Sequence, residues 1–258
     1  MINLLKSKWN GLKNLDAKRS SGEFFTICRW FNIQLTNAFG IVTTIHWTVS
    51  ASILALLLLS GQEQAWLFFI AMLSVVPHEY GHSIAGKYYG IKTSRILIYP
   101  VGGVALMEGM PKKWYQEIVV ALAGPAVSLG LTIIGFLGTW AEGPTKLLLN
   151  DDIVMRTYDP NSFWVALFII NLSLTIFNLL PAFPMDGGRV FRALLTPIFG
   201  HLRATQFSFY LAVVLSAGMV FLGLFLGSLS FIIVAVLVAL MARHEYLNVK
   251  KEAEENLI

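Results

Sequence analysis

Residues 73–86, "LSVVPHEYGHSIAG", place three ionisable side chains, His78, Glu79 and His82, in a part of the chain that is otherwise apolar. The stretch directly follows residues 66–72, "WLFFIAM", which have the composition of the interior of a membrane helix. An acidic side chain at the centre of a spanning helix costs about 2.5–3.5 kcal/mol on insertion scales, and such residues usually serve a function. The stretch therefore predicts a membrane helix that carries a functional site.

The composition of the whole chain agrees with a membrane location. Of its 258 residues, 56% are hydrophobic and only 13% are charged, whereas a soluble domain carries about 25% charged residues. The mean hydropathy of +0.66 argues against a large soluble domain. The net charge of +4 comes from Lys and Arg in loops between apolar runs, where membrane orientation and anionic lipids explain them, so we expect no nucleic-acid partner. The single cysteine, Cys28, excludes an intrachain disulfide.

Six apolar segments have roughly the 20 residues that a helix needs to cross the hydrocarbon core of a bilayer. They are residues 41–60, 65–87, 118–140 and 162–180, and two segments within the charge-free run 204–242. The sequence "LGSLS" divides that run, because its glycine and serines favour a tight turn. We therefore expect an all-α polytopic membrane protein with about six transmembrane helices.

The distribution of Lys and Arg gives an orientation for these six spans. With the N-terminus in the cytoplasm, 17 of the 19 Lys and Arg residues lie on the cytoplasmic side, and only Lys146 and Arg156 lie outside. Because cytoplasmic loops of membrane proteins are enriched in Lys and Arg, we expect both termini inside. We divide the chain into a basic N-terminal juxtamembrane segment (1–40), a membrane core (41–245) and a short charged cytosolic tail (246–258).

Two parts of the chain have the composition of strands rather than helices. Residues 91–108, "IKTSRILIYPVGGVALME", contain two short β-branched runs around "PVGG" and predict a hairpin-like pair of strands near the cytosolic membrane face. Residues 24–35, "FFTICRWFNIQL", also have strand character. Residues 1–20 fit either a basic amphipathic helix on the membrane surface or a basic leader that only sets the topology. We therefore expect a small membrane-associated β segment beside the helices.

His78 and His82 are four residues apart, which places both imidazoles on one face of a helix, where they can bind one metal ion. Glu79 lies beside them, in position to activate a water molecule at the metal. Zinc suits such a site because it accepts nitrogen and oxygen ligands and uses three protein ligands plus water in catalytic sites. The two histidines therefore leave a zinc site one protein ligand short.

Asp186 is the acidic residue best placed to complete the site. It lies in "FNLLPAFPMDGGRVFR" (177–192), where Pro181 and Pro184 end the fourth apolar helix. The second and fourth spans both run from outside to inside, so Asp186 and the two histidines fall near the same cytosolic face. Asn178, on the last turn of the fourth span, is placed either to hydrogen-bond a substrate carbonyl or to bridge two helices.

Two motifs, "HEYGH" (78–82) in one membrane helix and "NLLPAFPMDGGR" (178–189) at the end of another, closely resemble those of the site-2 protease family of intramembrane zinc metalloproteases. The sequence "YPVGGVALME" (99–108) resembles the membrane-embedded β segment of that family. The sequence "LAGPAVSLG" (122–130) resembles its third core helix. The resemblance covers about residues 30–245.

Position by position, the resemblance implies that His78, His82 and Asp186 bind one zinc ion per chain. It makes Glu79 the general base and proton shuttle, and it matches Asn178 to the family asparagine that helps to hold substrate. The family cleaves transmembrane helices of other membrane proteins near the cytosolic side, so the resemblance implies a transmembrane protein substrate within a lipid bilayer. We also expect a regulatory membrane partner, and a multi-pass protein in the cell membrane of a prokaryote.

The strands and the short loops add two expectations. An extended substrate could pair with a strand edge in residues 91–108, and Gly102 and Gly103 would allow its backbone to approach closely; an ordinary hairpin turn also explains this glycine pair. The loop 141–161 and the tail after Ala242 are too short for the PDZ or CBS domains of some relatives, so we expect a minimal catalytic core.

Besides a site-2-type zinc endopeptidase, the sequence allows three other interpretations. A proton-coupled transporter or channel would use the buried His and Glu cluster as a proton relay. A different membrane metalloprotease would take its third ligand from a later glutamate, such as Glu117. An inactive family member would act as a scaffold, which the intact motif disfavours.

Overall fold

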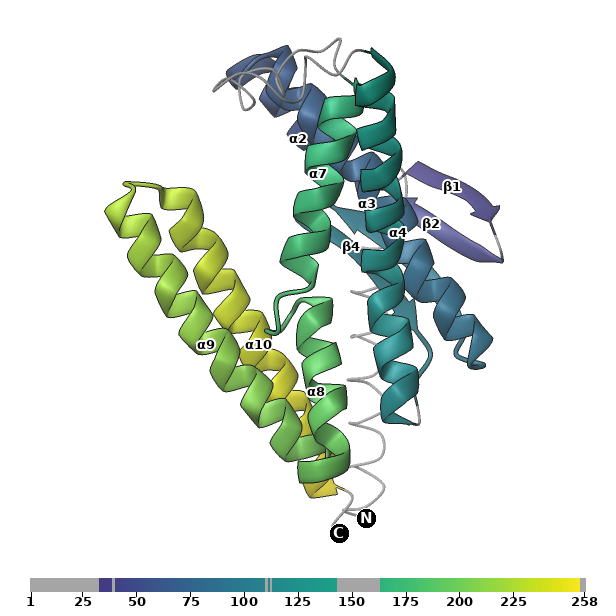
Figure 1. Ribbon diagram of the computed structural model, residues 1–258, viewed down its shortest axis with the longest axis vertical. Coiled ribbons are helices and arrows are strands. Elements are labelled where there is room, and N and C mark those ends of the chain that lie inside the picture. The colour runs from purple at the N-terminus through teal and green to yellow at the C-terminus, as the bar shows by residue number, and fades with distance from the viewer. Residues whose placement is uncertain (1–32, 39, 110, 112, 143–162, 256–258) are drawn as a thin grey trace, which may run out of the picture.

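Helices make up most of the described chain (Figure 1). The computed structural model describes residues 33–38, 40–109, 111, 113–142 and 163–255. Its helices are α2 (Trp47–Leu59), α3 (Gln62–Tyr88), α4 (Trp114–Glu142), α7 (Phe163–Asn178), α8 (Asp186–Phe199), α9 (His201–Phe225) and α10 (Leu229–Glu255). Its strands are β1 (Ile33–Ala38), β2 (Ile41–Ile45), β3 (Thr93–Tyr99) and β4 (Gly102–Met107). The described chain is thus mostly helical with one small sheet, as the sequence predicted.

Each of the six apolar segments identified in the sequence overlaps one helix of the structure, and α10 continues well beyond its segment. In the described part of the chain, three helices are both long and apolar enough to cross a membrane: Trp114–Ala141, His201–Phe225 and Phe231–Glu255. The apolar helices α2 and α7 are shorter, and α3 has 27 residues but carries the polar side chains of the histidine motif. Length and composition therefore support α4, α9 and α10 as membrane spans. They do not by themselves show that α2, α3 and α7 cross the membrane.

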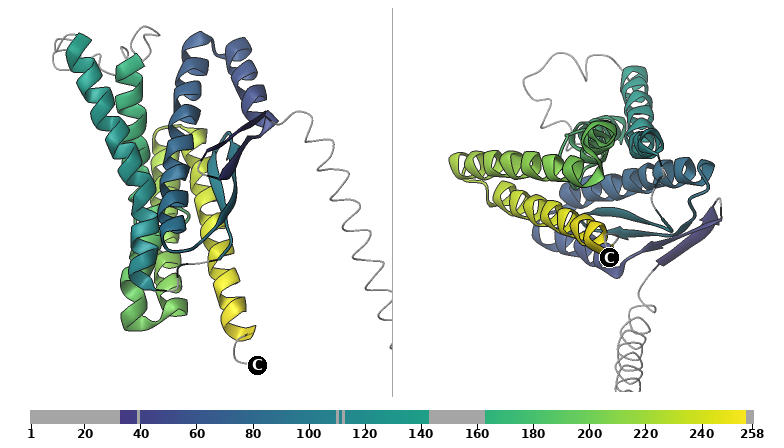
Figure 2. Two further views of the ribbon diagram at one scale, coloured as in Figure 1. Left: turned by 90° about the vertical axis from the view of Figure 1, so that its right-hand side faces the viewer. Right: turned by 90° about the horizontal axis from the view of Figure 1, so that it is seen from below.

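The sheet has four strands in the order β1-β2-β3-β4, and its second half packs against α3 (Figures 1 and 2). The strands β3 and β4 form the antiparallel hairpin that the sequence predicted, with Tyr99 opposite Gly102 at the turn. Ile96 and Ile98, alternate residues of β3, are fully buried and form a core cluster with Val75 of α3. This burial attaches the sheet to the helix that carries the histidines, and β4 is an edge strand.

One expectation about this region is wrong: residues 41–45, predicted to begin the first membrane helix, form the strand β2. All five residues, "IVTTI", are β-branched, and such side chains favour strands over helices. The strand pairs in parallel with β3 and antiparallel with β1, so the expected strand pair is part of a larger sheet. The helix α2 begins at Trp47, where the N-cap residue His46 accepts a hydrogen bond from the Thr48 amide.

Parts of the sequence prediction fall on residues that the structure does not describe. The last residues of the strand expected at 24–35 lie in β1, while residues 24–32 lie outside the described chain. The same holds for the alternatives offered for residues 1–20 and for most of the loop 141–161.

Glycines bring α4 into close contact with both α3 and α7. A Cβ added at Gly81 of α3 would meet the carbonyl oxygen of Ala123 in α4, at 2.6 Å. A Cβ added at Gly135 of α4 would meet the backbone of Phe168 in α7, 2.6 Å from its amide nitrogen. Small residues at such positions allow helix backbones to approach within a membrane. The three helices therefore form one tightly packed group around the histidines.

The helices α9 and α10 form a hairpin that diverges from α7, so that the loop end of the hairpin lies farthest from α7 (Figures 1 and 2). They are separated at residues 226–228, where Gly227 has a φ of 64°, which confirms the turn predicted at "LGSLS". The hairpin packs against α8 and against the segment before it, where Phe183 is buried with Ala212 and Ala242. The helix α8 is thus the main connection between this hairpin and the other described helices.

We predict that Gly135→Ala destabilises the protein, whereas Gly130→Ala, five residues earlier in the same helix, does not. The methyl group added at Gly135 would collide with the α7 backbone, and overpacking of this kind costs about 1–3 kcal/mol. At Gly130 no heavy atom of the described chain lies within 4 Å of an added Cβ, and Ala favours a helix over Gly. Thermal unfolding in detergent with a chelator present measures the difference, and equal melting temperatures would contradict this packing.

Candidate metal centre

The two histidines of α3 and the first residue of α8 meet in a buried cluster. His78 Nε2 lies 3.2 Å from His82 Nε2. Asp186 Oδ2 lies 3.3 Å from His78 Nε2 and 3.2 Å from His82 Nε2. The three atoms form a nearly equilateral triangle. Within the described chain, these residues are the group of His, Cys, Asp and Glu side chains that lies close enough together to hold a metal ion.

The local sequence explains how three residues from distant parts of the chain converge. Four residues make slightly more than one helical turn, so α3 presents both histidines on one face. Asp186 reaches them because the chain turns sharply between the end of α7 and the start of α8. Gly187 and Gly188, at the start of α8, let this turn pack closely against the helix, since a Cβ at either position would overlap backbone atoms of residues 179–183. The structure thus brings together the three metal-ligand candidates selected from the sequence.

A further set of contacts, all from α4, fixes the orientation of both imidazoles. His82 Nδ1 donates to the backbone carbonyl of Val120 over 2.7 Å, and His78 Nδ1 lies 2.9 Å from Ser128 Oγ. Gly124 lies between these contacts, and a Cβ there would overlap the Nε2 atoms of both histidines. Such hydrogen bonds determine which ring nitrogen faces a metal. The contacts from Val120 and Ser128 have no local signal in the sequence, although the small residues of "LAGPAVSLG" indicate a closely packed helix.

The chemistry of the three converging atoms favours a bound cation. A carbonyl can only accept, so in the neutral imidazole of His82 the proton lies on Nδ1 and Nε2 offers a lone pair. Asp186 Oδ2 is buried without a hydrogen bond from any described residue. Lone pairs that face one another at this distance repel unless a cation lies between them. Four-coordinate zinc with ligands at about 2.0–2.1 Å places neighbouring ligand atoms about 3.3–3.4 Å apart, so the triangle fits zinc.

The cluster opens into a cavity of about 630 Å³. Glu79, Asn178 and Gly103, all selected from the sequence, line this cavity together with the metal-ligand candidates. Glu79 lies directly against Gly103. A Cβ added at that glycine would overlap the glutamate side chain. Asn178 Nδ2 donates to the carbonyl of Leu174 in its own helix over 3.0 Å. Gly102 is not among the residues that line the cavity; with a φ of 137° it is the first residue of β4, directly after the hairpin turn.

Two arginines of α8 also line the cavity, and sequence analysis did not select them. Arg189 follows Asp186 by three residues, and Arg192 follows Arg189 by three more, so their helical spacing was the available signal. Glu117, an alternative third ligand, bonds to Arg192 and does not belong to the metal-binding group. The cavity wall therefore carries basic side chains from the same helix that supplies the carboxylate.

Comparison with known proteins agrees with this geometry. The sequence model of the family described as "Peptidase family M50" matches residues 66–148 and 141–225. Zinc metalloprotease MJ0392 of Methanocaldococcus jannaschii is 35% identical over 214 residues, which cover 81% of this chain and 58% of the relative. Stage IV sporulation protein FB of Bacillus subtilis is 29% identical over 142 residues, which cover 54% of this chain and 42% of the relative. The chain thus spans only about half the length of these curated relatives.

A solved structure is also similar to this chain. The structure described as "Site-2 Protease from Methanocaldococcus jannaschii" matches with a TM-score of 0.61 and 33% sequence identity. The match covers 84% of this chain and 95% of the solved chain. Because the likeness extends over nearly the whole solved chain, the two proteins share their fold.

We predict that Ser128→Ala weakens zinc binding, because His78 loses the hydrogen bond that orients its ring. Loss of such a contact typically lowers metal affinity about 10–100-fold. Thr132→Val is the matched control, since it removes a buried hydroxyl from the same helix whose bond goes to a backbone carbonyl and not to a histidine. Competition with a chromogenic chelator measures the zinc affinity of each variant in detergent. Wild-type affinity in Ser128→Ala would show that this serine does not orient His78.

Proposed function

Because the chain belongs to peptidase family M50, the site-2 protease family, we propose that it is an intramembrane zinc metalloprotease. It hydrolyses peptide bonds within or near transmembrane segments of membrane-protein substrates, close to the cytosolic face. One observation carries the proposal: the ligand atoms of His78, His82 and Asp186 form a triangle of zinc dimensions in a cavity that Glu79 also lines. No observation on the described chain favours the alternative of a proton-coupled transporter.

The residues of the site divide the chemistry between them. His78, His82 and Asp186 hold one zinc ion per chain, which when bound would supply Lewis-acid activation of water and of the scissile carbonyl. Glu79 lines the same cavity and acts as general base, accepting a proton from the attacking water and passing it to the leaving amine. Asn178, at the end of α7, hydrogen-bonds the substrate backbone beside the scissile bond.

The edge strand β4 supports a specific way of holding substrate. A transmembrane helix hides its carbonyl groups in internal hydrogen bonds, so it must unwind locally before hydrolysis. Residues Gly103–Met107 line the cavity, and β4 has a partner on only one side in the described sheet. An extended substrate segment pairs with this open edge. Gly103 allows the substrate backbone to approach Glu79, while Gly102 directly follows the hairpin turn.

The membrane arrangement belongs to the same proposal. The helices α2, α3, α4, α7, α9 and α10 are the six spans, and both termini lie in the cytoplasm of a prokaryote, as the distribution of Lys and Arg favours. The proposed units are a juxtamembrane segment (1–40), a metalloprotease core (41–245) and a charged tail (246–258), of which the first contributes β1 to the sheet and the last continues α10 to Glu255. The regulatory membrane partner stays a prediction.

We predict that Glu79→Gln abolishes cleavage while zinc binding and folding persist. Removal of a general base lowers the rate about 10²–10⁴-fold, and the amide keeps the size of the carboxylate. Glu63→Gln, which changes an exposed glutamate in the first turn of the same helix, is the control and should cleave like wild type. The assay measures zinc per chain and cleavage of a test transmembrane substrate by purified protein in detergent. Full cleavage by Glu79→Gln, or a wild type that binds no zinc, would refute the proposal.

The proposed orientation predicts on which side of the membrane each loop lies. Labelling of single introduced cysteines in intact cells tests it. With Cys28→Ser as background, a membrane-impermeant maleimide should label the Asp152→Cys variant in intact cells. The Lys251→Cys variant should react only after the cells are broken, because its position lies on the cytoplasmic side. If both variants react before lysis, the six-span arrangement with an internal C-terminus is wrong.

A further inference from the structure

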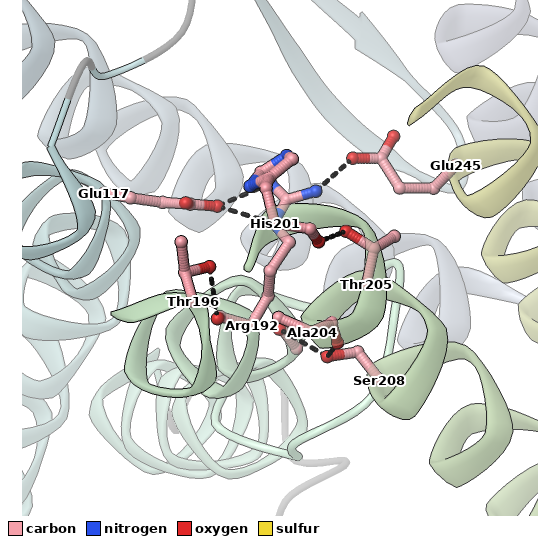
Figure 3. Close-up of polar contacts among 9 residues, drawn as sticks. Glu117, Arg192, Thr196, His201, Ala204, Thr205, Ser208 and Glu245 are labelled. Atoms are coloured by element: carbon pink, nitrogen blue, oxygen red, sulfur yellow. Dashed lines mark hydrogen bonds and ion pairs between the residues drawn. The ribbon is translucent and has the colours of Figure 1, made fainter. Parts of the chain in front are cut away.

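Three helices meet at the guanidinium group of Arg192 (Figure 3). The Arg192 side chain is only 1% exposed. Its Nε donates to Oε1 of Glu117 in α4 over 2.9 Å, and its Nη1 donates to Oε1 of Glu245 in α10 over 2.8 Å. The ring of Phe183 lies 5.0 Å from the guanidinium carbon. One buried cation of α8 is therefore bound to carboxylates from two other helices.

This cluster is a costly way to pack three helices together. Burying an ion pair takes both charges out of water, and apolar side chains of similar size would often stabilise the contact as well or better. Ionisable groups in the interior of a membrane protein usually mark a function. Arginine differs from lysine in holding two partners at fixed angles through a planar group. The arrangement therefore favours a role in fixing the relative positions of the three helices.

The contact with Glu117 completes a ring of contacts around the metal centre. Glu117 lies three residues before Val120, whose carbonyl accepts the hydrogen bond from His82. Arg192 lies six residues after Asp186, less than two turns along α8. The ring thus runs from His82 through α4 to Arg192 and back through α8 to Asp186, which is 3.2 Å from His82. A shift of α8 against α4 would move the carboxylate away from both imidazoles.

The contact with Glu245 reaches a part of the cavity wall that α10 supplies. Met241 of α10 lines the cavity, and Glu245 follows it one turn later. In the described part of the chain, the Arg192–Glu245 ion pair is the polar contact that ties α10 to a helix other than α9. The position of this cavity wall therefore depends on the same guanidinium group that positions α8.

We propose that Arg192 is a positioning residue with two separable roles. Its bond to Glu117 holds Asp186 at the distance from the two histidines that metal binding requires. Its bond to Glu245 holds α10 in place as a wall of the cavity. The first role concerns metal binding alone, and only the consequence of the second for substrate binding rests on the proposed protease function.

The test compares Glu117→Gln and Glu245→Gln in the full-length chain, with Glu254→Gln as matched control. Glu254 carries the same charge at an exposed position near the end of α10, where it lies 3.9 Å from Lys250. Chelator competition measures zinc affinity, and hydrogen exchange measures the local stability of α10 around Met241. Steady-state cleavage of a test transmembrane substrate at saturating zinc gives kcat and KM.

We expect Glu117→Gln to lower the zinc affinity about 10–100-fold, while Glu245→Gln and the control keep the wild-type affinity. We expect Glu245→Gln to accelerate hydrogen exchange around Met241 several-fold and to raise KM more than it changes kcat, because a displaced wall weakens substrate binding. A purely structural cluster would instead lower the melting temperature and the zinc affinity alike in both variants.

Each role can be overturned separately. Wild-type zinc affinity in Glu117→Gln would overturn the first role, and unchanged hydrogen exchange in Glu245→Gln would overturn the second. If a glutamine variant does not fold, the aspartate variant at the same position, which keeps the charge but shortens its reach, is measured with the same expected split. Zinc affinity and hydrogen exchange need no substrate, so a wild type that does not cleave would count against the proposed function and not against the roles of Arg192.

Discussion

Three buried ligand atoms that converge inside the protein are the constraint on which the rest of the structure depends. The ligand atoms of His78, His82 and Asp186 lie 3.2–3.3 Å apart, a separation that suits a bound zinc ion. Two helices that are distant in sequence must be held in this position, so backbones approach closely at several glycines of α3, α4 and α8. Glycine occurs where any side chain would fill that space, as Gly124 does beside the imidazoles.

The buried polar side chains around this centre connect helices to one another. Ser128 and the Val120 carbonyl join α4 to the histidines of α3, and Asn171 of α7 donates to Ser74 of α3 over 2.9 Å. Hydrogen bonds between membrane helices contribute modest stability, and their geometry also restricts how the helices can slide past one another. The helices that form the cavity are thus fixed by directional contacts as well as by apolar packing.

The sequence predicted the metal-ligand candidates because their signals are local or depend only on topology. The spacing of His78 and His82 is visible within one turn, and the charge distribution along the chain predicts that Asp186 lies near the same membrane face. The strand at residues 41–45 escaped prediction because a β-branched apolar run satisfies the hydropathy of a span and of a buried strand equally. The partners of Arg192 escaped because they lie 75 and 53 residues away, and no local pattern links them.

The parallel pairing of β2 with β3 has a consequence for where along its backbone a substrate would be cleaved. The chain leaves β2, forms α2 and α3, and returns in β3, so the sheet and the helix that carries His78 and His82 are parts of one continuous unit. Gly103 of β4 lies directly against Glu79 within that unit. For a substrate strand bound to β4, the register of its pairing with the strand would therefore determine which peptide bond lies beside Glu79. Because successive side chains of a strand point to opposite faces, preferences for particular substrate side chains would recur at every second residue. The residues on either side of the cleaved bond would need no fixed identity.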